Sequence, residues 1–226
     1  MLSIYFYILS KKINKLNIPN TYYPLLPFAS KLGFQIGDFY SGLYHYFMDT
    51  YDFSLLSILH ENFRKHHDNP LSMEKYPFME SITEITPIGI PMLFLIEFDD
   101  QLFQYIHILS NVIMCSASIN HRFAHRRTHE NDKDKNGKRK FSKVPEIIRY
   151  LQDNNIILNP KHHRKHHKLE ITNYCISNGS TSKLMNKIIN LFELPISTYK
   201  NSKNIHKIYK TNKEKKEYLR SKNIIL

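Results

Sequence analysis

Four histidine-bearing stretches, spread over the chain, constrain the possible folds more than any other feature of this sequence. They are His45-Tyr-Phe-Met-Asp49, His66-His67, His121-Arg-Phe-Ala-His125 and His162-His163-Arg-Lys-His166-His167. Residues four apart in an α-helix are separated by only about 40° around its axis, so their side chains share a face. The pattern therefore predicts helices whose histidine faces meet inside one fold.

The number of histidines indicates more than one metal ion. A tetrahedral zinc site needs four ligands, and these stretches offer more imidazoles than that. Imidazole also binds iron and copper, and iron with open coordination positions suits oxygen activation. A single HxxxH helix is often structural, whereas the four imidazoles within residues 162–167 would repel one another as cations and seldom form a core. The four stretches together predict a centre of two iron ions.

The expected site comprises nine histidines and one carboxylate. We predict as catalytic and metal-binding residues His45, His66, His67, His121, His125, His162, His163, His166 and His167, with Asp49 as a further metal ligand. The remaining histidines are interpreted as exposed or core residues outside the site: His60, His107, His129 and His206.

Two apolar segments, 85–96 and 102–119, are separated by acidic residues at 97–100. Each is shorter than the roughly 20 residues that a transmembrane helix needs, but together they fit a membrane hairpin with a hydrated turn. A buried helical hairpin is the alternative. Residues 1–10 are apolar without a signal-peptide pattern and predict a short interfacial helix or anchor.

Charge and composition bear on partners and domains. The net charge is +12, which suits an anionic membrane surface, and no recognition-helix or zinc-finger spacing supports nucleic-acid binding. Two distant cysteines make no disulfide framework, and Cys115 is expected in the core. We predict an N-terminal segment 1–21, a main domain 22–198 and a Lys-rich tail 199–226 that is partly helical and poorly packed.

The motifs resemble those of the Kua/CarF lipid desaturases, a family that includes plasmanylethanolamine desaturase and, more distantly, the plastid palmitoyl-phosphatidylglycerol trans-3 desaturase. Residues 38–49 resemble the D-x-x-S-G-x-x-H-W-x-x-D box, and residues 63–70 the F-x-x-H-H-x-x-P element. Residues 120–125 resemble the H-K-W-S-H box, and 151–167 resemble L-Q-D…I-L-P-R-K-H-H-R-I-H-H. Asn173-Tyr-Cys and Gly179 match the downstream element.

This resemblance implies an all-α, integral-membrane helical bundle with a histidine-box di-metal centre. It further implies two iron ions, O2 as oxidant, a cytochrome b5-type electron donor and a multi-pass protein of the endoplasmic reticulum. The implied reaction forms the vinyl ether bond of plasmalogens in a membrane phospholipid. Arg64, Lys161, Arg164 and Lys165 are candidates to bind the phosphate headgroup.

Several departures from the family pattern leave alternatives open. Tyr46 and Phe123 replace family tryptophans, the loop 130–143 resembles an insertion, and Leu169-Glu170 stand where many plasmanylethanolamine desaturases carry Pro-His. Glu170 is a possible replacement ligand. The same centre also suits an acyl-chain desaturase or hydroxylase. A non-enzymatic metal-binding membrane protein and a soluble metal hydrolase are the remaining alternatives.

Overall fold

The computed structural model describes residues 1–51, 66–67, 69–70, 72–75, 81, 83–138, 140–169, 172–200, 205–209 and 217. Its helices are α1 (Leu2–Lys15), the 3-10 helix η1 (Asn20–Leu25), α2 (Leu26–Thr50), the 3-10 helix η3 (Ser72–Lys75), α5 (Thr86–Leu95), α6 (Gln101–His129), α7 (Glu146–Asp153), α8 (Pro160–Leu169) and α9 (Ser182–Leu191). Its strands are β1 (Ile196–Lys200) and β2 (Ile205–Tyr209).

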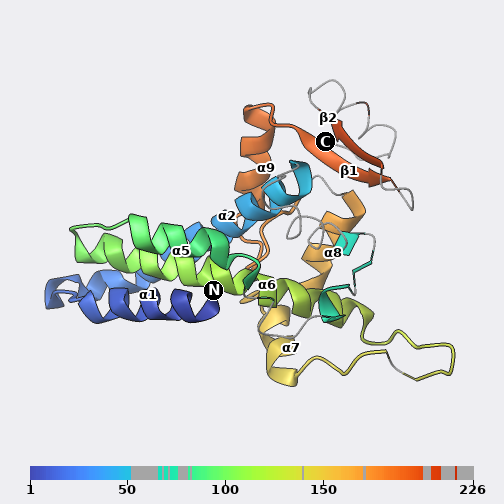
Figure 1. The fold of residues 1–226 in the computed structure, drawn as a ribbon, viewed down its shortest axis with the longest axis horizontal. Helices are drawn as coiled ribbons and strands as arrows, with labels where there is room; N and C mark the ends of the chain where they lie inside the picture. The colour runs from blue at the N-terminus through green and yellow to red at the C-terminus, as the bar shows by residue number, and fades with distance from the viewer. Residues whose placement is uncertain are drawn as a thin grey trace.

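Helices α2 and α6 form the spine of the molecule and run side by side in the same direction (Figure 1). Near their starts, Ser30 Oγ lies 2.7 Å from Tyr105 Oη. Further along, a Cβ added at Gly37 would lie 2.5 Å from the carbonyl oxygen of Ser110. Glycine at this position therefore lets the two backbones approach closely, which brings their C-terminal halves together.

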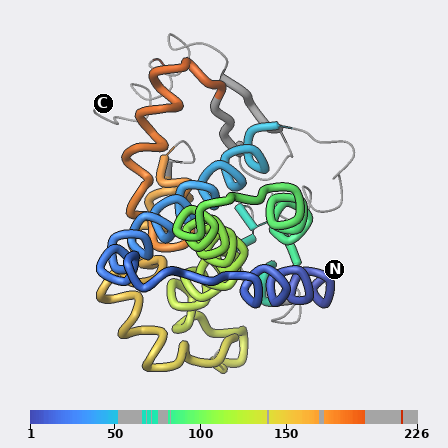
Figure 2. Tube along the Cα trace, turned by 90° about the vertical axis from the view of Figure 1, so that its left-hand side faces the viewer, coloured from blue at the N-terminus to red at the C-terminus, as the bar shows by residue number. Residues whose placement is uncertain are grey.

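Helices α1 and α5 run opposite to this spine and complete a four-helix bundle at one end of the molecule (Figure 2). Tyr5 Oη donates to Asn111 Oδ1 over 3.1 Å, and Asn111 Nδ2 donates to the carbonyl of Gly89 over 3.0 Å. One buried amide thus joins α1, α5 and α6. Cys115 is buried beside Gly89, as the apolar sequence around it predicts.

The predicted hairpin of two apolar helices is confirmed as α5 and α6, joined by the acidic turn. Asp100 caps α6, since its Oδ1 accepts from Leu102 N at 2.8 Å and from Phe103 N at 3.0 Å. Among the described residues, α6 is the one helix whose length and composition suit a bilayer span. Of its apolar 18-residue stretch, 56% is buried inside the protein. Helix α5 has ten residues.

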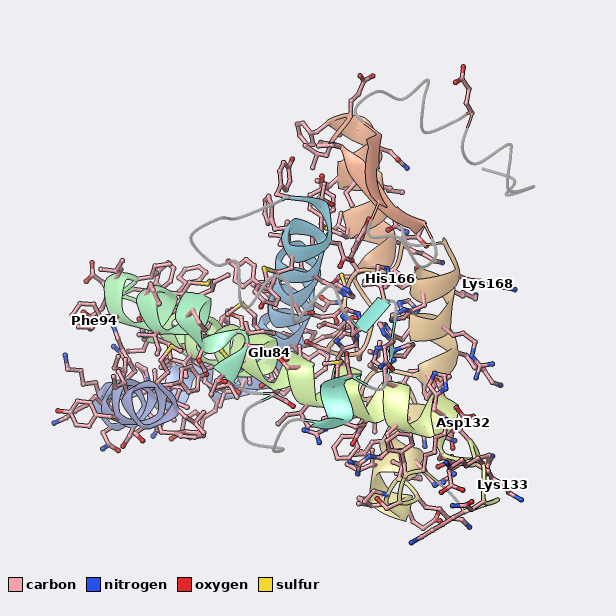
Figure 3. All side chains as sticks on the ribbon, turned by 45° about the vertical axis from the view of Figure 1, so that its right-hand side comes forward. Glu84, Phe94, Asp132, Lys133, His166 and Lys168 are labelled. Atoms are coloured by element: carbon pink, nitrogen blue, oxygen red, sulfur yellow. The ribbon has the colours of Figure 1, made fainter. Side chains whose placement is uncertain are left out.

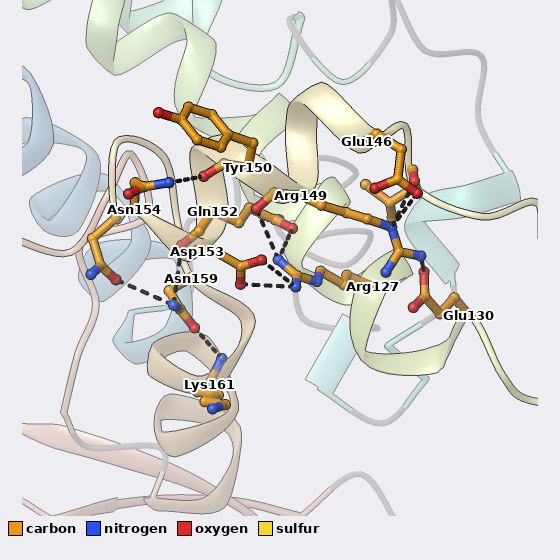
Figure 4. A network of polar contacts seen from close by, with 12 residues as sticks. Arg127, Glu130, Glu146, Arg149, Tyr150, Gln152, Asp153, Asn154, Asn159 and Lys161 are labelled. Carbon is orange, nitrogen blue, oxygen red and sulfur yellow. Dashed lines mark hydrogen bonds and ion pairs between the residues drawn. The ribbon is translucent and has the colours of Figure 1, made fainter.

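A polar network fixes α7 and the start of α8 against the end of α6 (Figure 4). Arg127 donates to both carboxylate oxygens of Asp153, at 2.8 and 2.9 Å. Asn159 donates to the carbonyl of Gln152 at 3.1 Å and accepts from Lys161 N at 2.9 Å, so it is the N-cap of α8. The start of the helix that carries the HHRKHH run is thus attached to α7 and, through α7, to the end of α6.

The predicted all-α class is confirmed, with one short antiparallel hairpin, β1–β2, added near the C-terminus. Within the predicted Lys-rich tail, residues 205–209 form a strand that pairs with β1 from Ile196↔Tyr209 to Lys200↔Ile205. These segments are rich in β-branched and aromatic residues, which favour strands. At the other end, α1 is longer than expected and reaches Lys15.

Candidate metal centre

The three histidine-bearing helices converge where α2, α6 and α8 meet, and Figure 3 shows nitrogen-bearing side chains gathered there around His166. The side chains form two groups, within each of which the ligand atoms lie within 4.8 Å of one another. The first cluster is His66, His121, His125, His163 and His167. The second cluster is His45, Asp49, His67 and His166.

In the first cluster the Nε2 atoms crowd together. His163 Nε2 lies 2.9 Å from the Nε2 of His121, of His125 and of His167. His125 Nε2 and His121 Nε2 are 3.1 Å apart. A neutral imidazole nitrogen has either one proton or one lone pair, so these four close contacts cannot all be hydrogen bonds at once.

These separations match ligands around one ion. With a metal–nitrogen distance of about 2.1 Å, two ligands at a right angle lie about 3.0 Å apart, whereas tetrahedral neighbours lie about 3.4 Å apart. The distances of 2.9–3.1 Å within the first cluster are therefore short enough for these Nε2 atoms to bind one ion together.

Burial keeps these imidazoles neutral. Burial, reinforced by the neighbouring imidazoles, holds the pKa of His163 well below its ordinary value of 6.5. The same two causes, in the same order, lower the pKa of His66. Neutral imidazoles present lone pairs, which is the protonation state that a metal ion requires.

In the second cluster, two imidazole rings direct nitrogen lone pairs at the carboxylate of Asp49. His45 Nδ1 lies 2.9 Å from the carbonyl oxygen of Tyr174, and His166 Nδ1 lies 2.8 Å from that of Thr172. A carbonyl only accepts, so each Nδ1 carries the proton and each Nε2 has a lone pair. Both Nε2 atoms lie 3.3 Å from Asp49 Oδ2.

A bound cation would account for two imidazole nitrogens that face one carboxylate oxygen. Burial lowers the pKa of His45 to about 3, and this effect outweighs the attraction of Asp49. His67 Nε2 lies 3.0 Å from the other carboxylate oxygen, Asp49 Oδ1. The second cluster is therefore a mixed imidazole–carboxylate set, which suits iron, whereas the described part of the first cluster is purely imidazole.

The structure brings together every predicted ligand except His162. His162 Nε2 lies 3.1 Å from Ser182 Oγ, and its ring packs against Gly179, so it belongs to neither cluster. His107 contacts the carbonyl of Met92 and His129 contacts Asp132, so both lie away from the clusters as expected. His60, Arg64 and Glu170 are outside the described residues.

The sequence motifs do not indicate the two carbonyl groups that orient the second cluster. Those of Thr172 and Tyr174 belong to the backbone, and side-chain patterns do not report where a backbone carbonyl points. The candidate headgroup residues Arg164 and Lys165 are exposed on α8, while His163 and His166 on the same helix are buried.

A buried carboxyl lies close to the end of α6 that carries the first cluster. Glu84 precedes α5, and its Oε2 atom is fully buried. Its carboxyl group interacts electrostatically with Arg122. Burial raises the pKa of Glu84 to about 7, against the opposing effect of Arg122. A carboxyl that holds its proton more tightly in the folded state stabilises the fold below pH 4.5, and this stabilisation is lost as the pH rises through 7.

We therefore expect Glu84→Gln, which resembles the protonated form, to raise the free energy of unfolding at pH 8 by up to about 3 kcal/mol. At pH 4.5 the two proteins should have nearly equal stability. Denaturant unfolding at both pH values measures the difference, with Glu146→Gln, an exposed glutamate of α7, as the control. An equal effect at both pH values would contradict a raised pKa.

Comparison with known proteins agrees with this geometry. Residues 34–195, well over half of the chain, match the lipid desaturase domain. No match was found among curated proteins or solved structures. The matched span contains every residue of both clusters, and these clusters are compatible with the metal binding of an oxidoreductase that acts on lipid with O2. The chain is therefore a member of the lipid desaturase domain family.

Proposed function

We propose that the protein is a membrane lipid desaturase that uses two iron ions and O2, most specifically to form the vinyl ether bond of plasmalogens. The observation that carries this proposal is the pair of adjacent, buried histidine clusters within the lipid desaturase domain. Nine donor residues serve two ions, with the first ion held by the first cluster and the second ion by the second cluster.

Bound iron supplies O2 activation and the redox chemistry that removes hydrogen from an unactivated chain. In the overall reaction, neighbouring methylenes lose two hydrogen atoms and O2 becomes two water molecules. A cytochrome b5-type donor supplies the two electrons this requires, and solvent the two protons. The chain's own residues hold the ligands in place: the carbonyls of Tyr174 and Thr172 keep His45 and His166 with their Nε2 atoms toward Asp49.

The exposed apolar side chains near one end of the four-helix bundle are the part that we propose to contact the bilayer. Phe28 on α2 and Phe94 and Leu95 on α5 are 74%, 68% and 75% exposed. Figure 3 shows Phe94 at the end of the bundle far from His166. Lysines at the end of α1 suit an anionic lipid surface beside this end. Endoplasmic reticulum membrane is the proposed location.

The proposed substrate is the 1-O-alkyl chain of an ether phospholipid. The second candidate is an acyl-chain desaturase or hydroxylase, which is favoured by the run Asn173-Tyr174-Cys175 and by Leu169 after the last histidine pair. The trans-3 desaturases resemble the chain at both places. The two candidates share the metal centre and differ in product.

Expression in cells that lack plasmalogen synthesis, followed by lipid analysis, tests the proposal. A vinyl ether phospholipid that forms only when the protein is present is the expected result. A new acyl double bond or a hydroxylated chain would favour the second candidate. Metal analysis of the purified protein should give two irons per chain, and a single zinc would overturn the desaturase proposal.

Arg164 and Lys165 are proposed to hold the phosphate of the headgroup. The variant with Arg164→Gln and Lys165→Gln is expected to raise KM for the lipid by about 3- to 10-fold with little change in kcat, because an exposed charge contributes to binding before the chemical step. The control removes the same charge from α9, at the exposed residues Lys183 and Lys187. Equal KM changes in both variants would indicate a general charge effect.

A further inference from the structure

Asp38 of α2 is completely buried and accepts hydrogen bonds from a single loop, residues 177–181. Its Oδ1 accepts from Ser177 N at 3.2 Å, Asn178 N at 2.9 Å and Gly179 N at 3.0 Å. Its Oδ2 accepts from Thr181 N at 2.9 Å, Thr181 Oγ1 at 2.7 Å and Ser180 Oγ at 3.3 Å. No Lys or Arg forms an ion pair with Asp38 in the described part of the chain.

The preceding part of the same loop is attached to α2 as well. Ser41, one turn after Asp38, accepts from Ile176 N through its Oγ at 3.1 Å. A Cβ added at Gly42 would lie 2.4 Å from Cys175 Sγ, so the loop packs directly on the helix. Gly179 adopts φ +82°, a conformation that favours glycine, and this allows the loop to turn around the carboxylate.

This attached loop begins with the two carbonyl groups that orient the second cluster. The carbonyl of Tyr174 accepts from His45 Nδ1 and that of Thr172 accepts from His166 Nδ1. The segment 172–174 therefore sets the tautomer and the ring orientation of both imidazoles. The ligands of the first cluster lie on α6, on α8 and at His66, and the network at Asn159 holds α8 from its other end.

We propose that Asp38 is a positioning residue for the second cluster alone. By fixing residues 172–181 on α2, it holds the two carbonyls against His45 and His166 and sets the affinity of the second ion. The proposal rests on the proposed function, because it requires that the clusters bind metal. Loss of an outer hydrogen-bond partner of a ligating histidine typically lowers metal affinity by about 10- to 100-fold.

The test is Fe(II) binding to the full-length protein. Asp38→Asn is expected to retain one tightly bound iron per chain and to bind the second about 10- to 100-fold more weakly in competition with a chelator. Thr181→Val, which removes one hydroxyl donor and leaves the carboxylate, should shift the same ion in the same direction by a smaller factor. Asp100→Asn is the matched control, an aspartate with backbone donors at the far end of α6, and should keep both ions.

The outcomes separate the two proposals. Two tight ions in both Asp38→Asn and Thr181→Val would overturn the role of Asp38 and leave the metal centre standing. Equal weakening of both ions in Asp38→Asn would overturn its selectivity for the second cluster. Wild-type protein that binds no Fe(II) would overturn the proposed function, and the role of Asp38 with it.

Discussion

Replacing His163 with alanine is expected to empty the first cluster and to reduce desaturation at least about 100-fold, since even outer-shell partners of metal ligands cost about 10- to 100-fold. Its Nε2 atom lies 2.9 Å from the Nε2 atoms of His121, His125 and His167, which are three of the four other ligands in the first cluster. Iron content and product formation in the same preparation measure the effect.

The neighbouring residue provides a matched control. His162→Ala removes an imidazole from the same helix and the same HHRKHH run, but His162 contacts Ser182 and Gly179 outside both clusters. We expect this variant to keep both ions and to lose no more than a few-fold in activity. Loss of one ion from His162→Ala, or full iron content in His163→Ala, would contradict the division of histidines derived from the structure.

Helical spacing was sufficient to predict which residues approach one another. His121 and His125 share a face of α6, and His163 and His167 share a face of α8, and all four meet in the first cluster. Side chains four residues apart share a helix face whatever the helix packs against, so these pairs could be predicted without knowledge of tertiary contacts. The i, i+4 pair of His45 and Asp49 was predicted in the same way and lies in the second cluster.

Spacing was not sufficient to divide the ligands between two groups. His162 and His166 are also four apart, yet only His166 enters a cluster. The difference arises from the loop after α8, because Gly179 and Ser182 occupy the space around the His162 ring. Contacts with a segment that is distant in sequence decide this, and no pattern within α8 contains the information.

The strands of the C-terminal hairpin were not predicted from composition. Lysines suggested a solvated, partly helical tail, whereas Ile205, Tyr209 and their partners pair as strands. Composition over a wide window concealed the short β-branched and aromatic segments. The residue types within each five-residue segment favour a strand. Which residues pair, however, depends on how the two segments meet in the folded chain.

Asp49→Asn is expected to abolish the second metal site and lower desaturation at least about 100-fold, while leaving the metal-free fold intact. The carboxylate contributes the one negative charge among the ligands of the described clusters, and its oxygens lie 3.0–3.3 Å from His67, His45 and His166. An asparagine keeps the shape and can donate an N–H to a neutral imidazole. The variant should therefore unfold at a denaturant concentration equal to or above that of the metal-free wild type.

Asp132→Asn serves as the control for Asp49→Asn, because Asp132 also pairs with a histidine, His129, at 3.0 Å, but on the surface beyond the end of α6. It should leave iron content and activity unchanged. A fall in the stability of metal-free Asp49→Asn, in step with its loss of iron, would mean that Asp49 supports the fold rather than the ion. Unchanged iron content would contradict the assignment of Asp49 as a ligand of the second ion.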